Sequence, residues 1–193
     1  MRIFLSTFFL LTFFNCVSTK EESISLSYDI YSNQIKSCTG RGSISSSGNF
    51  SGSLTFSFMS QNDSSFCQFQ DFLGRKVLLL WLTQESIDAW NLIENKKYNY
   101  SNVSEIIPIL SVLNPSHLIK FLWGEEITSN EMSVSSKEKI EIKLGKSDQN
   151  SSVFDQASFV DNLNRQELLI KIDSRVFNQN YLNLKKYWEI ILS

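Results

Sequence analysis

Residues 49–60 read NFSGSLTFSFMS, a stretch in which large apolar side chains alternate with small and mostly hydroxyl-bearing ones. Successive side chains of a β-strand point to opposite faces, so this alternation predicts a strand with one apolar and one polar face. The apolar face holds Phe50, Leu54, Phe56 and Phe58, and the other holds Ser51, Ser53, Thr55 and Ser57. A strand of this kind belongs to a sheet that covers a core on one side.

Residues 77–82 read VLLLWL and are apolar at every position. Such a strand must be covered on both faces, so it predicts a sheet with something packed on each side. Gly40-Arg41-Gly42 opens the strand-rich region that contains both stretches. Further strands are predicted over residues 66–70, 87–93, 139–144, 168–172 and 182–192.

Helical spacing predicts three short helices, over residues 24–35, 102–110 and 115–123. Alternation at the start of the first segment also permits a strand there. Asn102 and Glu105 have the spacing of a capping box at the start of the second helix. Pro115 suits the first turn of the third helix, and Gly124 suits its stop. The order of helix, strands, two helices and more strands predicts an α+β fold with one large antiparallel sheet.

Residues 1–15 form an apolar leader after a single charge at Arg2, too short to span a bilayer as a helix. Cys16 follows the leader and a polar run follows Cys16, which predicts a lipoprotein signal peptide with Cys16 as the acylated N-terminus of the mature chain. Residues 16–23 are then a tether to a single domain over 24–193. The alternative is ordinary cleavage after Ser18, which would release the chain without a lipid anchor.

The composition excludes several classes of function. The 193 residues carry a net charge of −2 with both signs dispersed, which argues against nucleic-acid binding. The single histidine, His117, has no sequence partners for catalysis, so we expect it at the surface or at a helix cap. There is no Gly-x-Ser-x-Gly motif and no metal-ligand spacing, which predicts no catalytic residues, no metal and no cofactor. A carboxylate pair stays open, and with it a secreted hydrolase as the least favoured function.

Cys38 and Cys67 remain once Cys16 is assigned to acylation. An even pair in an exported chain permits a disulfide without demanding one. Two buried free thiols are an equal alternative, because cysteine packs well in cores.

Large apolar side chains are abundant on the predicted strands and helices, with 15 Phe in the chain. They either fill a core or leave an apolar cavity for acyl chains, if a strongly curved sheet is closed by the helices.

Four segments together resemble a known family: Gly40-Arg41-Gly42, Asp71-Phe72-Leu73-Gly74, residues 115–124 and residues 185–192. In order and spacing, from residue 24 to the C-terminus, the chain resembles the outer-membrane lipoprotein receptor family typified by LolB, which shares a wider fold with the periplasmic carrier LolA. The resemblance implies an unclosed β-barrel, a strongly curved antiparallel sheet with short helices over an apolar cavity.

The resemblance also implies a function without enzymatic activity. The protein would be a monomer, lipid-anchored at the periplasmic face of the outer membrane, that accepts lipoproteins from a LolA-like periplasmic carrier and inserts them into that membrane. The membrane-insertion loop would consist of Phe72, Leu73 and Gly74, with Leu73 as its inserting side chain. We expect the acyl chains in a cavity lined by Phe56, Phe58, Leu79, Trp81, Ile106 and Leu118. The alternative of the same fold is a soluble periplasmic lipoprotein carrier or a lipid-sensing module.

Overall fold

Nine strands form one antiparallel sheet in the computed structural model, which describes residues 34–48, 51–99, 115–127, 140–149, 151–161 and 165–192. The strands are β1 (Ser37–Ser47), β2 (Gly52–Gln61), β3 (Ser64–Gln70), β4 (Lys76–Leu82), β5 (Ile87–Asn91), β6 (Lys96–Tyr98), β7 (Ile140–Gly145), β8 (Gln156–Asp161) and β9 (Gln166–Asn178). Two helices belong to the same part of the chain, α2 (Pro115–Trp123) and α4 (Leu184–Leu192).

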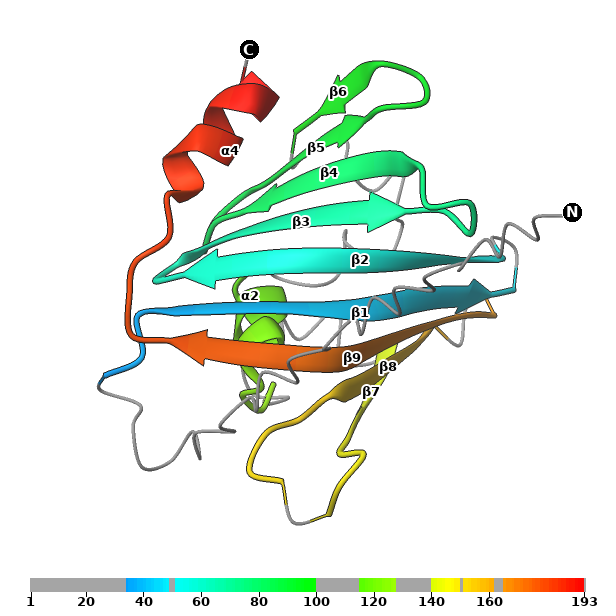
Figure 1. The fold of residues 1–193 in the computed structure, drawn as a ribbon. Coiled ribbons are helices and arrows are strands. Elements are labelled where there is room, and N and C mark those ends of the chain that lie inside the picture. The colour runs from blue at the N-terminus through cyan, green and yellow to red at the C-terminus, as the bar shows by residue number, and fades with distance from the viewer. Residues whose placement is uncertain are drawn as a thin grey trace, which may run out of the picture.

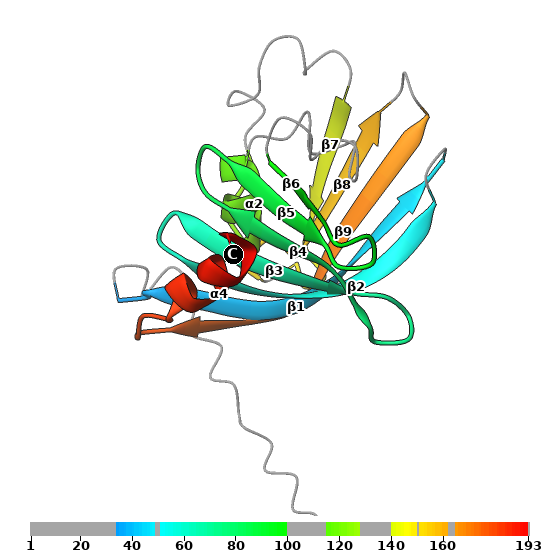
Figure 2. The same cartoon turned by 90° about the horizontal axis from the view of Figure 1, so that it is seen from above.

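The sheet is curved and open. Its strand order is β6-β5-β4-β3-β2-β1-β9-β8-β7, so β6 and β7 are edges that do not pair with each other. Figure 1 shows the sheet from its outer side, and Figure 2 shows how it curls around α2. The predicted α+β fold with one curved antiparallel sheet is therefore confirmed. None of the described helices is long and apolar enough to cross a bilayer.

Two glycines of β1 allow the close packing that accompanies this curvature. A Cβ atom at Gly40 would lie 2.5 Å from the ring of Phe58, and one at Gly42 would lie 2.9 Å from the ring of Phe56. Each would also lie 2.3 Å from a backbone carbonyl oxygen of β9. The register of β1 against β9 shifts between Arg41 and Gly42. Irregular registers and glycines bend strands, so this segment bends the sheet and brings the two rings against β1.

Both faces of β4 are covered, as its uninterrupted apolar sequence predicted. Leu80 and Leu82 belong to the inner core, which the sheet shares with α2. Leu79 and Trp81 belong to an outer cluster, which the sheet shares with α4. Alternate residues of one strand thus enter two separate apolar clusters.

The C-terminal segment differs from its prediction. Residues 182–192 were expected to form a strand, but Leu184–Leu192 is the helix α4. Leu184, Tyr187 and Trp188 have the three- and four-residue spacing of one helix face and belong to the outer cluster. The ring of Trp188 lies 4.5 Å from that of Trp81, centroid to centroid. This aromatic packing overrides the alternation that the sequence also shows.

Other differences concern strand number and length. Neither β6 nor β8 was predicted, and β9 has 13 residues where the sequence predicted only residues 168–172. The predicted helix over 102–110 lies outside the described residues, as does the one over 24–35 except for its last two residues, which are not helical.

Candidate functional site

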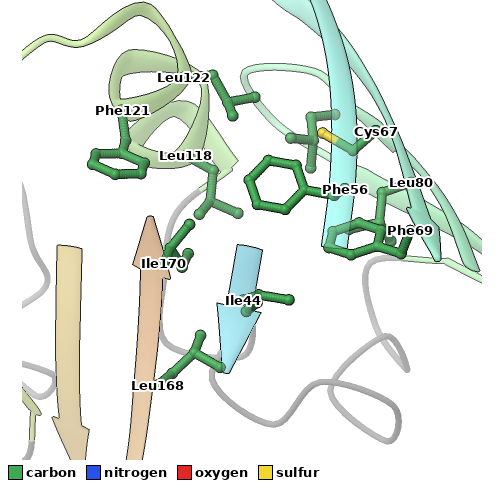
Figure 3. A pocket seen from close by; sticks show the side chains of 11 residues that line it. Ile44, Phe56, Cys67, Phe69, Leu80, Leu118, Phe121, Leu122, Leu168 and Ile170 are labelled. Atoms are coloured by element: carbon green, nitrogen blue, oxygen red, sulfur yellow. The ribbon is translucent and has the colours of Figure 1, made fainter. Parts of the chain in front are cut away.

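An apolar pocket lies between the inner face of the sheet and α2 (Figure 3). Its lining comes from five strands and one helix, and every lining residue is apolar. The residues are Ile44, Phe56, Cys67, Phe69, Leu80, Leu82, Leu118, Phe121, Leu122, Leu168 and Ile170. The side chain of Leu118 points from α2 toward Phe56 on β2. A site with this lining offers contact and desolvation but no charged group.

The pocket has little free volume. Its volume is about 50 Å³, whereas pockets that hold small ligands have volumes of about 300–1,000 Å³. The rings of Phe56 and Phe69 lie 5.4 Å apart, centroid to centroid, and take up much of the inner space. This apolar pocket is therefore too small for an acyl chain, and the described residues do not show the large apolar cavity of the sequence prediction.

Arg175 of β9 holds the C-terminal end of α2. Its Nε donates to the carbonyl oxygen of Leu122 (2.9 Å), and its Nη2 donates to those of Phe121 (2.8 Å) and Phe154 (2.6 Å). Burial lowers the pKa of Arg175 to about 10, so the guanidinium stays charged at neutral pH. A positive charge at a helix C-terminus also interacts favourably with the helix dipole.

A second set of contacts ties the last turn of α2 to the sheet. The indole Nε1 of Trp123 donates to Oγ of Ser60 (2.7 Å), and that oxygen lies 2.6 Å from Oγ of Ser65. Gly124 follows with a φ of 85°, which glycine adopts easily, and ends the helix where the sequence predicted. These side-chain hydrogen bonds fix the C-terminal end of the pocket's helix wall to the sheet.

The β3–β4 turn presents two exposed apolar side chains. Phe72 is 89% exposed and Leu73 is 62% exposed. Asp71 orders this turn: its Oδ1 accepts from the amides of Leu73 (3.0 Å) and Arg75 (2.9 Å), and its Oδ2 lies 2.7 Å from Nη2 of Arg75. Gly74 has a φ of 77°. We call residues 71–75 the hairpin tip.

The same contacts affect the charge of Asp71. Desolvation acts to raise the pKa of its carboxyl, but the hydrogen bonds from Arg75 and from the Leu73 amide outweigh desolvation. The pKa of Asp71 is therefore lowered, and the carboxylate that orders the tip stays ionised at neutral pH.

The structure separates the residues that the sequence analysis grouped in one cavity. Phe56 and Leu118 line the pocket, and Phe58 belongs to the same inner core. Leu79 and Trp81 belong to the outer cluster with α4, so their assignment to the cavity was wrong. Because β4 is apolar on both faces, its sequence does not indicate which residues face inward. Ile106 and Cys16 lie outside the described residues.

The two cysteines are free, buried thiols. Cys38 is on β1 and Cys67 on β3, with β2 between them. Two strand spacings put their Cα atoms about 9–10 Å apart, beyond the roughly 7 Å that a disulfide spans. The disulfide alternative is therefore excluded in this structure. Burial raises the pKa of each thiol to about 12.

His117 is buried on α2 rather than at the surface, which corrects our expectation. Among the described residues, no group of three His, Cys, Asp or Glu side chains could hold a metal ion.

Several residues of the site were missed. Leu168 and Ile170 lie in a predicted strand, and their alternation could have indicated an inward face. Nothing in the sequence pairs Arg175 with the end of a helix 53 residues away.

The fold and the pocket together define an open, curved antiparallel sheet with an apolar site under a helix. No profile of a known protein family matches the chain, and no curated protein matches its sequence. One solved structure to which this chain is similar is described as an outer membrane lipoprotein-sorting protein domain from Vibrio parahaemolyticus, with 5% identity and a TM-score of 0.44, covering 86% of this chain and 96% of that one. Another is a DUF1329 family protein from Desulfovibrio piger, with 8% identity and a TM-score of 0.40, covering 88% of this chain and 99% of that one. At such TM-scores, neither similarity supports an assignment of function.

Proposed function

We propose that the protein is an outer-membrane-anchored lipoprotein that accepts lipoproteins from a periplasmic carrier and inserts them into the outer membrane. The observation that carries this proposal is the ordered hairpin tip, which holds Phe72 and Leu73 out in solvent. Exposed apolar side chains on a rigid turn suit shallow insertion into a leaflet. The resemblance of the sequence to the LolB family supports the same role.

The apolar pocket supplies the second part of the function. Burial of an acyl chain is favourable by about 0.8 kcal/mol of free energy per methylene. A lipoprotein anchor must therefore stay covered while it passes between membranes. The pocket offers such cover only if it opens. We propose that α2 moves away from the sheet, because Leu118, Phe121 and Leu122 of this helix fill the pocket. The acyl chains have a lower free energy in the bilayer than in the pocket. We therefore propose that the transfer needs no nucleotide hydrolysis.

One residue of the pocket lining lies close in sequence to the hairpin tip. Phe69 lines the pocket and lies on β3, two residues before Asp71. We propose that an acyl chain leaves past Phe69 and that Leu73 disturbs the adjacent leaflet during release.

The proposed anchor at Cys16 keeps the protein at the periplasmic face of the outer membrane as a monomer. Membrane fractionation of the wild type and of Cys16→Ala distinguishes this anchored form from a soluble carrier. Recovery of the wild type in the soluble fraction would contradict the anchor.

The function is tested by Leu73→Glu in a transfer assay with an acylated lipoprotein, its carrier and vesicles. We expect normal uptake from the carrier and lost delivery to the vesicles. Tyr181→Glu is the matched control, because Tyr181 is also 62% exposed and lies outside the tip. Undiminished delivery by Leu73→Glu would contradict the proposed function.

A further inference from the structure

A second hairpin projects from the same end of the sheet as the hairpin tip. Gln70 pairs with Lys76 across the β3–β4 hairpin, and Asn91 pairs with Lys96 across the β5–β6 hairpin. The amide of Leu92 donates to the carbonyl of Val77 (2.9 Å), so the end of β5 lies beside the start of β4. Figures 1 and 2 both show the two turns on the same side of the molecule. The hairpins are two strand spacings apart, roughly 10 Å.

The second hairpin also ends in an exposed apolar side chain. Ile93 is 71% exposed, and among the described large hydrophobic residues only Phe72 is more exposed. The side chain of Asn91 orders this turn, since its Oδ1 accepts from the amides of Ile93 (3.0 Å) and Glu94 (3.2 Å). Each hairpin thus uses an Asx side chain to hold an apolar residue outward.

Basic side chains surround the two apolar points. Arg75, Lys76, Lys96 and Lys97 are all exposed. The acidic residues of the two turns are engaged within their own hairpins: Asp71 with Arg75, and Glu94 with the hydroxyl of Tyr98 (3.3 Å). Four basic residues face the two acidic ones, so the pair of hairpins carries a net charge of about +2, although the whole chain has a net charge of −2.

We infer that Phe72, Leu73 and Ile93, with the lysines beside them, form a docking surface for an anionic bilayer. Apolar side chains enter the boundary between headgroups and acyl chains, and the adjacent cations meet the lipid phosphates. Two apolar points on separate hairpins also fix the orientation of the sheet on the membrane, which a single point does not. This inference deepens the proposed function, because it names the lipid class at the delivery end.

The test uses the anchored full-length protein with an environment-sensitive dye on Ile93→Cys, in vesicles of phosphatidylethanolamine with or without phosphatidylglycerol. Cys38 and Cys67 are buried and do not compete for the dye. We expect a blue shift of the dye in the anionic vesicles only, and its loss at high salt. The same dye on Ile190→Cys of α4 should not respond.

The basic residues are tested by the triple change Lys76→Gln, Lys96→Gln and Lys97→Gln, which should abolish the blue shift. A control with the same loss of charge elsewhere is Lys143→Gln, Lys171→Gln and Lys185→Gln, which should retain it. An equal response in neutral vesicles, an equal effect of the two triple variants, or a response that requires added carrier protein would overturn the inference.

Delivery of cargo measured in the same vesicles separates the two proposals. Delivery without a dye response leaves the proposed function standing and removes the docking surface. A dye response without delivery leaves the docking surface standing and removes the proposed function.

Discussion

Replacement of Arg175 by methionine should loosen α2 without removing much apolar volume. The change deletes three hydrogen bonds from a charged donor to the carbonyls of Phe121, Leu122 and Phe154. Such bonds contribute about 1.5–3 kcal/mol each, but the desolvation of the guanidinium offsets part of the sum. We expect the free energy of unfolding to fall by about 2–4 kcal/mol.

Urea unfolding followed by tryptophan fluorescence measures this loss, with an unchanged m-value as the sign that only stability has changed. Arg41→Met is the matched control, because Arg41 is exposed on β1, where it pairs with Ser174, the neighbour of Arg175. We expect the control to stay within about 0.5 kcal/mol of the wild type.

The same variant should bind an apolar dye such as N-phenylnaphthylamine more tightly at urea concentrations well below unfolding. The reason is that α2 carries three residues of the pocket lining, which separate from the sheet when the helix loosens. A variant as stable as Arg41→Met would refute the role of Arg175. A destabilised variant with unchanged dye binding would refute α2 as the movable wall.

Three further predictions concern packing and the buried thiols. Gly40→Ala should lower the free energy of unfolding by about 1–3 kcal/mol in urea, because its Cβ would lie 2.3 Å from the carbonyl oxygen of Ser174, whereas Gly52→Ala, with open space around it, should change little. Below pH 9, iodoacetamide should modify Cys67 about a thousandfold more slowly in the native state than in urea, because burial raises its pKa from 9.0 to about 12; mass spectrometry would show rapid native labelling if this were wrong. Since the unfolded thiols ionise first, stability should be full below pH 9.0 and fall as the pH rises toward 12, and a Cys38→Ala, Cys67→Ala variant should show a smaller fall in urea titrations.

The sequence predicted the strands that bury one face. In β2, Phe56 and Phe58 alternate with polar residues, and burial on one side of a sheet enforces this pattern. The sequence also predicted both ends of α2, because Pro115 and Gly124 act through backbone conformation and need no distant partner.

The sequence could not predict features that depend on distant partners. An all-apolar strand such as β4 does not reveal which residues face α2 and which face α4. In α4, Trp188 fits both a strand and a helix, and its packing on Trp81 decides between them. The hold of Arg175 on α2 depends on a register that only the assembled sheet provides.

The closed pocket sets a minimum length for the acyl chain that the proposed function requires. To open the pocket, Leu118, Phe121 and Leu122 must leave it, and full exposure of such side chains costs about 1.5–3 kcal/mol each, or roughly 5–9 kcal/mol together. Burial of ten acyl-chain methylenes in the opened pocket offsets this cost by about 8 kcal/mol, at about 0.8 kcal/mol each. The outer cluster between α4 and the sheet is separate from the pocket, so it can hold the fold while α2 moves. Fatty acids with more than about ten methylenes should therefore displace a bound dye, while those with about half as many should not. Equal displacement by short and long chains would show that binding does not require the pocket to open.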